Sequence, residues 1–290
     1  MNLIELNSLM SIIQAVGFGL GMGANSLISR NLGAKKDNDA CKYGNSTFSA
    51  AIIFGLCLMV FGLLGLHLLI RILGSTETML PYSCDYGKYI LIGASVMCSS
   101  FVLNNIIRFE GHALYAMWGL CIGGILNMIV DPIFIFGFDM GISGAAIATI
   151  VSFMRLLSIF IRNKSIVKLG LKYISRNSRD YLHIVKTGFP TICRQMLGSV
   201  SSALLNIQAA VFGDAAVGTI TIANKIYIFV RNVILGIGQG FQPVVGYNYG
   251  DHNKKRVKEA FIFSCTAALV IGLNTSGVIA WFRKDDMEVI

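Results

Sequence analysis

Eight long apolar stretches dominate this sequence and limit the folds that are open to it. Each is long enough to cross a bilayer, which takes about 20 residues. None shows the short alternating segments of a membrane barrel, so each predicts a transmembrane helix. We place the stretches at residues 3–29, 47–72, 88–107, 113–137, 142–162, 184–212, 217–247 and 257–282.

The composition agrees with a chain that is embedded in a membrane. Charged residues make up 13% of the 290 residues and hydrophobic residues 54%, whereas a soluble domain carries about 25% charged residues. So few charges cannot cover the surface of a soluble body of this size. We therefore expect an all-α integral membrane protein, a polytopic helix bundle in the cell membrane.

The net charge of +9 arises from Lys and Arg in the loops between the apolar stretches. The loops after the first, third, fifth and seventh stretches hold most of these residues, and the opposite side has only Arg71, Lys88, Arg283 and Lys284. Cytoplasmic loops are enriched in Lys and Arg, so the richer side is predicted to face the cytoplasm. With this distribution we expect no nucleic-acid partner.

An internal repeat links two stretches that lie 217 residues apart. Residues 19–36 read Gly-x-Gly-x-Gly, then Asn-Leu-Gly and two lysines, and residues 236–256 read Gly-x-Gly-x-Gly, then Asn-Tyr-Gly and Lys-Lys-Arg. An even number of predicted helices separates the copies, so both run in the same direction across the membrane. Such a parallel repeat is typical of transporters with two related halves.

The repeat predicts two pseudo-symmetric lobes. We expect an N-terminal lobe of five helices at residues 1–162, a basic cytoplasmic linker at 163–183 and a C-terminal lobe of three helices at 184–290. Two full copies of such a unit need about 430 residues. The second copy ends soon after its second helix, so we expect the chain to be a fragment.

Asp131 is the residue that most suggests chemistry. It lies about 9 Å inside the outer end of the fourth stretch, at 1.5 Å per residue, where a carboxylate is costly and marks an ion or proton pathway. Asn127 shares its helix face, and Pro132 leaves the Met128 carbonyl without its helical donor. These oxygens suit Na⁺, and a desolvated carboxylate alone suits H⁺. A polar packing contact is the alternative.

Several segments resemble the multidrug and toxic compound extrusion (MATE) family of secondary antiporters. The matching segments are residues 21–40, 106–138, 141–153, 188–190 and 236–260. The most specific strings within them are NxxxDPxFIF at 127–136 and QPVVGYNYG at 242–250. Members of the family have twelve helices in two lobes. The resemblance implies that the eight stretches correspond to helices two to nine, with the first helix and the last three absent.

The resemblance also implies a function and a site. A member of this family exports drugs or other lipophilic organic cations in exchange for Na⁺ or H⁺, without a cofactor, and a full-length chain is expected to be monomeric. The family's N-lobe cation site corresponds to Asp131, Asn127 and Thr149. Thr149 lies at a depth similar to that of Asp131, because a very short turn joins the fourth and fifth stretches.

Further polar and soft residues are candidates for lining the cavity. Polar groups in membrane helices face the bundle interior, and Met suits bulky lipophilic cations. Helix–helix hydrogen bonds are the alternative for the two asparagines, and snorkelling is the alternative for the lysine. The candidates are Asn104, Asn105, Met128, Arg194, Gln195 and Lys225.

Two alternatives to an antiporter stay open. Arg155, Arg194, Lys225 and Arg231 could hold the pyrophosphate of a lipid-linked oligosaccharide in a flippase of the same superfamily. The chain could also be a non-transporting fragment. An enzyme is not expected, because the sequence has no P-loop, HExxH or GxSxG motif.

Overall fold

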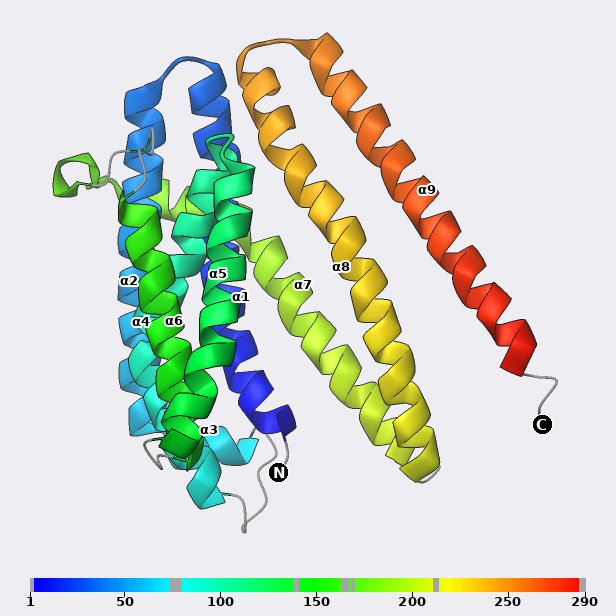
Figure 1. Cartoon of the computed structure of the whole chain (residues 1–290). Coiled ribbons are helices and arrows are strands. Elements are labelled where there is room, and N and C mark those ends of the chain that lie inside the picture. Colours follow the sequence, from blue (N-terminus) through cyan, green and yellow to red (C-terminus); the bar gives the residue numbers. More distant parts are fainter. Residues whose placement is uncertain are drawn as a thin grey trace.

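The computed structural model describes residues 3–72, 80–137, 141–162, 167, 170–210 and 214–286. These residues form mostly long helices, with no strand among them (Figure 1). The helices are α1 (Leu3–Gly33), α2 (Asp37–Leu64), α3 (Leu66–Ile72), α4 (Leu80–Phe109), α5 (Ala113–Pro132), the π-helix η1 (Ile133–Gly137), α6 (Gly141–Arg162), the 3₁₀ helix η2 (Leu171–Tyr173), α7 (Ser178–Ala210), α8 (Asp214–Gly250) and α9 (Lys254–Asp286).

The structure confirms an all-α membrane bundle. Within the described residues, six helical segments are long and apolar enough to cross a membrane. Their polar ends continue beyond the apolar stretches, so most helices are a few residues longer than predicted. The six segments are Leu9–Gly33, Asp37–Leu64, Ser83–Phe109, Ala113–Pro132, Ala223–Gly250 and Lys254–Thr275.

Two helix boundaries differ more clearly from the prediction. The stretch 47–72 was expected to form one helix, but its backbone leaves helical geometry at Gly65 (φ −106°, ψ 23°) and α3 continues beyond it. Helix α7 begins at Ser178, inside the expected linker, with Asp180 in its first turn. A carboxylate there interacts favourably with the partial positive charge of the helix N-terminus.

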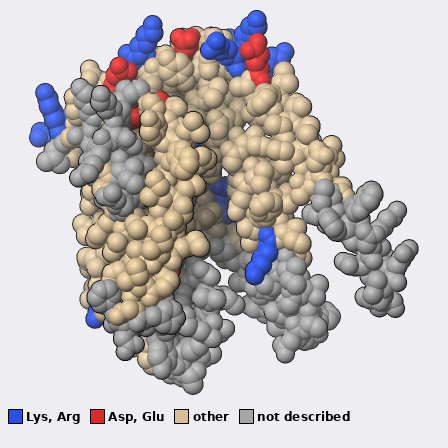
Figure 2. Space-filling model, in the orientation of Figure 1, with Lys and Arg blue, Asp and Glu red and all other residues tan. Residues whose placement is uncertain are grey.

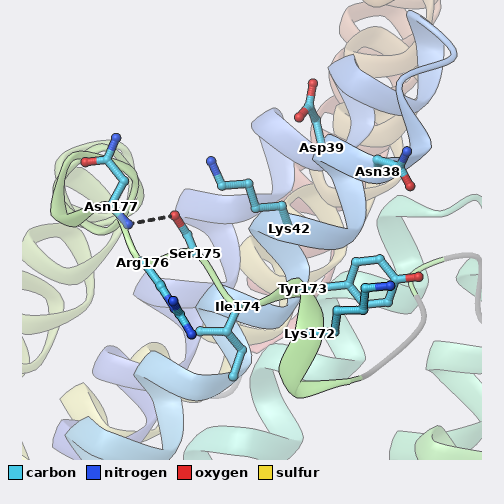
Figure 3. A pocket seen from close by; sticks show the side chains of 9 residues that line it. All are labelled: Asn38, Asp39, Lys42, Lys172, Tyr173, Ile174, Ser175, Arg176 and Asn177. Carbon is cyan, nitrogen blue, oxygen red and sulfur yellow. Dashed lines mark hydrogen bonds between the residues drawn. The ribbon is translucent and has the colours of Figure 1, made fainter.

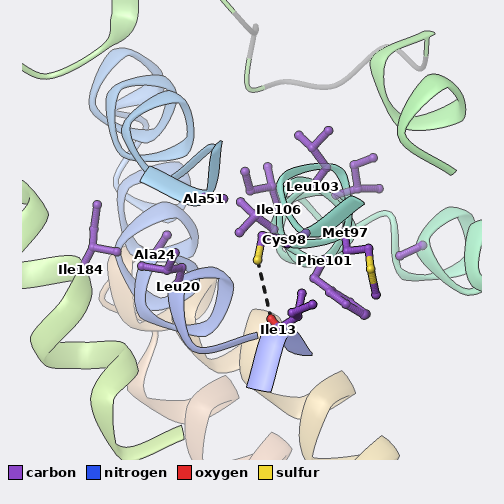
Figure 4. Close-up of a cluster of buried hydrophobic side chains, with 14 of the residues drawn as sticks. Ile13, Leu20, Ala24, Ala51, Met97, Cys98, Phe101, Leu103, Ile106 and Ile184 are labelled. Carbon is purple, nitrogen blue, oxygen red and sulfur yellow. Dashed lines mark hydrogen bonds between the residues drawn. The ribbon is translucent and has the colours of Figure 1, made fainter. Parts of the chain in front are cut away.

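The core of the molecule lies around α4. This helix packs against α1, α2, α5 and α6. Its own Met97 and Cys98 are fully buried, and so is Ile13 of α1 (Figure 4). The Cys98 thiol donates a hydrogen bond to the Ile13 carbonyl at 3.6 Å (Figure 4). Phe101 stacks 5.2 Å from Phe153 of α6, between ring centroids. These contacts bind α1–α6 into one unit, which we call the first helix group.

Helices α7–α9, the second helix group, meet the first group mainly through α1. The two groups lie close together at the end that carries the α1–α2 and α8–α9 turns and diverge toward the other end (Figure 1). The contact is close because glycines face backbone: a Cβ atom would lie 2.1 Å from the Ile184 oxygen if placed on Gly23, and 2.0 Å from the Tyr247 oxygen if placed on Gly33. Figure 2 shows the hollow that opens between the groups.

The charge distribution predicts which end faces the cytoplasm. Lys and Arg gather at the end where the two groups meet (Figure 2), and Lys35, Lys172 and Lys255 are exposed. In intact cells, single cysteines at these three positions should resist a membrane-impermeant maleimide and react after permeabilisation. A cysteine at Arg71, on the opposite side, should react in both cases. Reaction of the three lysine positions from outside would reverse the orientation.

Candidate functional site

Three residues singled out from the sequence meet between α5 and α6. The Asn127 amide nitrogen donates to Asp131 Oδ1 at 3.1 Å and lies 3.4 Å from Thr149 Oγ1, also as a donor. All three side chains are half-buried. The amide therefore bridges a carboxylate on its own helix and a hydroxyl on the neighbouring helix, and we call these residues the Asp131 cluster.

The local backbone explains why oxygen atoms gather at the Asp131 cluster. Asn127 and Asp131 are four residues apart on α5, so they lie on one face one turn apart. Pro132 ends α5, and a π-helix, Ile133–Gly137, follows directly. Pro132 has no N–H to donate to the Met128 carbonyl, and π-helical turns occur frequently at functional sites. A carboxylate, an amide and a hydroxyl are groups that can supply oxygen ligands to Na⁺.

Tyr86 of α4 belongs to the surroundings of this cluster, and the sequence analysis missed it. It lies close enough to Asp131 for the two groups to interact electrostatically. Its side chain is buried, and its hydroxyl donates to Met10 Sδ at 3.5 Å. The predicted third helix began at residue 88, whereas α4 begins at Leu80. The error in this boundary left Tyr86 outside the predicted helix.

The two asparagines proposed for the cavity have other contacts. Asn104 is buried and donates to the Ala116 carbonyl at 2.9 Å, which joins α4 to α5. Asn105 is also buried, donates to the Phe101 carbonyl at 2.8 Å and accepts a hydrogen bond from Arg108. These bonds place both amides in the packing between helices, away from the bonds of the Asp131 cluster.

The remaining cavity candidates lie further from the cluster's hydrogen bonds. Met128 is 75% exposed although it neighbours Asn127. Arg194 of α7 and Lys225 of α8 are exposed, and Gln195 is half-buried. The described hydrogen bonds of the Asp131 cluster come from α5 and α6.

The segment between the two groups is fastened to α2. The Gly170 N–H donates to Asn45 Oδ1 at 2.8 Å, the Ser175 N–H donates to Ser46 Oγ at 2.9 Å, and Lys42 forms an ion pair with Asp180 at 2.7 Å. The Lys42 ammonium and the Ser175 hydroxyl hold the pKa of Asp180 below its usual range, so the carboxylate is ionised at neutral pH.

An open pocket lies between this segment and the start of α2 (Figure 3). Within it the Asn177 N–H donates to Ser175 Oγ at 3.1 Å. Its walls come from α2 and from the segment, so both belong to one surface. The lining residues are Asn38, Asp39, Lys42, Lys172, Tyr173, Ile174, Ser175, Arg176 and Asn177.

Comparison with protein families gives one match that covers most of the chain. The sequence pattern of the MatE family matches residues 5–133 and 190–288. The matched ranges include Asn127, Asp131 and the whole of α8.

Curated relatives are similar over nearly the whole chain. The multidrug export protein MepA of Staphylococcus saprophyticus is 28% identical over 253 residues, which cover 86% of this chain and 56% of that protein. MepA of Staphylococcus aureus strain NCTC 8325 is 28% identical over 283 residues, which cover 92% of this chain and 62% of that protein. The chain therefore spans less than two thirds of the length of these relatives.

Solved structures share the fold. An outward-facing multidrug resistance MATE family transporter superposes with a TM-score of 0.88 at 28% identity, over 97% of this chain and 63% of that one. A MATE protein in complex with MaD5 gives a TM-score of 0.89 at 27% identity, over 96% of this chain and 64% of that one. Both likenesses extend across the first and second helix groups.

Proposed function

Because the chain belongs to the MatE family, we propose that the protein is a secondary active antiporter that exports drugs or other lipophilic organic cations in exchange for Na⁺ or H⁺. It is a multi-pass membrane protein of a transporter family rather than an enzyme. The relatives named multidrug export proteins support small organic molecules as substrates, and they favour export of such molecules over the flipping of a lipid-linked oligosaccharide.

The Asp131 cluster is the observation that carries the ion coupling. In the described arrangement the Asn127 N–H₂ group faces both the carboxylate and Thr149. Rotation of this amide would turn its oxygen toward the same space. The Asp131 carboxylate, the Asn127 oxygen and the Thr149 hydroxyl would then coordinate Na⁺. Protonation of Asp131 would serve H⁺ instead, since a neutral carboxyl group can still accept the Asn127 hydrogen bond.

The arrangement of the helices supports alternating access. In this proposal, residues 1–162 form the N-terminal lobe, 163–183 the linker and 184–290 the C-terminal part. The groups meet at the predicted cytoplasmic end and diverge at the other (Figure 1), as expected for an outward-facing state, and an outward-facing transporter superposes on the chain. Rocking of one lobe against the other would move the opening to the cytoplasmic side.

Drug susceptibility in an efflux-deficient bacterial host tests this function. Expression from the intact gene should raise the minimum inhibitory concentration of lipophilic cations such as ethidium and tetraphenylphosphonium. The two ion gradients are then collapsed one at a time. Only collapse of the gradient of the coupling ion, Na⁺ or H⁺, should remove the protection, and this identifies the ion. Unchanged susceptibility, despite protein in the membrane, would contradict the proposal.

A further inference from the structure

Arg108, near the end of α4, joins the two helix groups. One guanidinium nitrogen, Nη2, donates to Asn105 Oδ1 on its own helix. The other, Nη1, donates to Gln239 Oε1 on α8. Nη2 also lies 4.0 Å from Met22 Sδ on α1. One side chain thus connects α4, α1 and α8, across residues that are far apart in the sequence.

The guanidinium group of Arg108 forms hydrogen bonds with neutral groups. Within the described part of the chain, the residues that accept its hydrogen bonds are amides and a thioether. Its Nε atom is buried without a hydrogen-bond partner, and so is the Oδ1 atom of nearby Asn25, whose amide nitrogen contacts Met22 Sδ at 3.3 Å. A buried polar atom without a partner is unfavourable. The closed arrangement therefore combines favourable cross-group bonds with a desolvation cost.

Arg108 lies deeper in the molecule than the tight contact between α1 and α8 at the predicted cytoplasmic end. Met22 is about 16 Å along α1 from Gly33, at 1.5 Å per residue. Between this level and the helix end, a Cβ atom on Gly246 would lie 1.9 Å from Ser29 Oγ, and a Cβ atom on Gly250 would lie 2.1 Å from the Arg30 oxygen. Any opening of this end separates α8 from α1, and it must also break the bond between Arg108 and Gln239.

We propose that Arg108 is a positioning residue for transport, a latch that closes the cytoplasmic end of the cleft through Gln239. With the latch closed, the bond to Gln239 holds α8 against α4, while Arg108 Nε and Asn25 Oδ1 lack partners. With the cytoplasmic end open, the bond is lost and water reaches these atoms. The hydrogen bond to Gln239 favours the closed state, and the hydration of Arg108 Nε and Asn25 Oδ1 favours the open state. These two contributions oppose each other, so the states stay close in free energy and ligand binding can shift their populations. This inference rests on the proposed alternating-access function.

Distances between spin labels on the two groups test the latch. Lys35 and Lys255 are both exposed and follow α1 and α8, so labelled cysteines at these positions would report the separation of the groups by double electron–electron resonance. The protein would be expressed in a cysteine-free background, in which the seven cysteines of these 290 residues are replaced. Arg108→Gln should reduce the ratio of the short-distance to the long-distance population by roughly tenfold, as expected for loss of a hydrogen bond to a charged group.

Two substitutions of Gln239 complete the test: one strengthens the bond to Arg108, and the other replaces Arg108→Gln if that variant does not fold. Gln239→Glu replaces the neutral acceptor with a carboxylate, which should raise the short-distance population and slow transport. Arg176→Gln removes an exposed arginine of the linker and should change neither quantity. If Arg108→Gln does not fold, Gln239→Ala removes the same bond and should shift the population in the same direction as Arg108→Gln.

The outcomes separate this inference from the proposed function. Unchanged distance distributions in the folded variants at positions 108 and 239 would overturn the latch. Because the distances are measured without a substrate or an ion gradient, a protein that lacks ion-coupled export and still shows these shifts would contradict the proposed function and leave the latch standing.

Discussion

Ion-driven efflux is expected to fall to the background of the host when Asp131 is replaced with asparagine. The amide keeps the size of the side chain but removes the negative charge and the group that can take up a proton. A hydrogen bond or ion contact of a charged group is worth about 1.5–3 kcal/mol, which corresponds to a roughly 10- to 150-fold loss of cation affinity. Efflux of ethidium from preloaded cells that express the intact gene measures the effect.

Asp85→Asn is the matched control for this substitution. Asp85 is an exposed carboxylate next to Tyr86 on α4, and it has no described contact with the Asp131 cluster. This variant should retain efflux, and both variants should reach the membrane in equal amounts. Undiminished efflux in the Asp131→Asn variant would remove the cluster from the coupling mechanism.

A leucine at Gly188 is expected to destabilise the contact between α1 and α7. A Cβ atom there would lie 2.1 Å from the Gly19 carbonyl oxygen, which is backbone and cannot turn aside. Overpacking of this kind costs about 1–3 kcal/mol or more, and each kcal/mol lowers a thermal midpoint by about 2–4 °C in a chain of this size. The temperature at which half of the detergent-solubilised protein remains monodisperse should therefore fall by several degrees.

Gly198→Leu is the control on the same helix. No described atom lies within 4 Å of a Cβ placed on Gly198, so this leucine should leave the midpoint nearly unchanged. Equal midpoints for the two variants would show that α1 and α7 do not meet through Gly19 and Gly188.

The helices could be predicted because length and hydropathy are properties of local sequence. Each of the eight apolar stretches corresponds to helix in the described residues. The second is interrupted at Gly65, and the fourth changes from an α-helix to a π-helix after Pro132. The polar ends could not be placed, because they depend on contacts from elsewhere in the chain. The start of α7, for example, carries Asp180, which forms an ion pair with Lys42 of α2.

The contrast between local sequence and distant contacts also applies to the Asp131 cluster and to Arg108. Asn127 and Asp131 are one helical turn apart, so local sequence was sufficient to pair them. The short connection predicted only that Thr149 lies at a similar depth, and the resemblance to the MATE family grouped it with them. The proximity of Tyr86 to Asp131 and the bond between Arg108 and Gln239 depend on the packing of distant helices. No spacing in the sequence indicates either contact.

The paired Gly-x-Gly-x-Gly segments illustrate how equal sequence can have unequal surroundings. In the first copy, a Cβ atom on Gly21 would lie 2.6 Å from Asn105 Nδ2, and one on Gly19 would lie 2.2 Å from Ile192 Cγ1. In the second copy, no described atom lies within 4 Å of a Cβ on Gly236, Gly238 or Gly240. The repeat predicts related helices, but it does not predict which neighbours they contact.

Counterflow in proteoliposomes tests the central claim, exchange of an organic cation for Na⁺ or H⁺, most directly. Coupling between two ligands is reciprocal, so a gradient of the organic cation must drive the ion in the opposite direction. Addition of tetraphenylphosphonium outside vesicles that contain the intact gene product should release Na⁺ or H⁺ from the lumen, and the Asp131→Asn variant should release neither ion. Uptake of the organic cation by the unaltered protein without release of either ion would contradict the antiport mechanism.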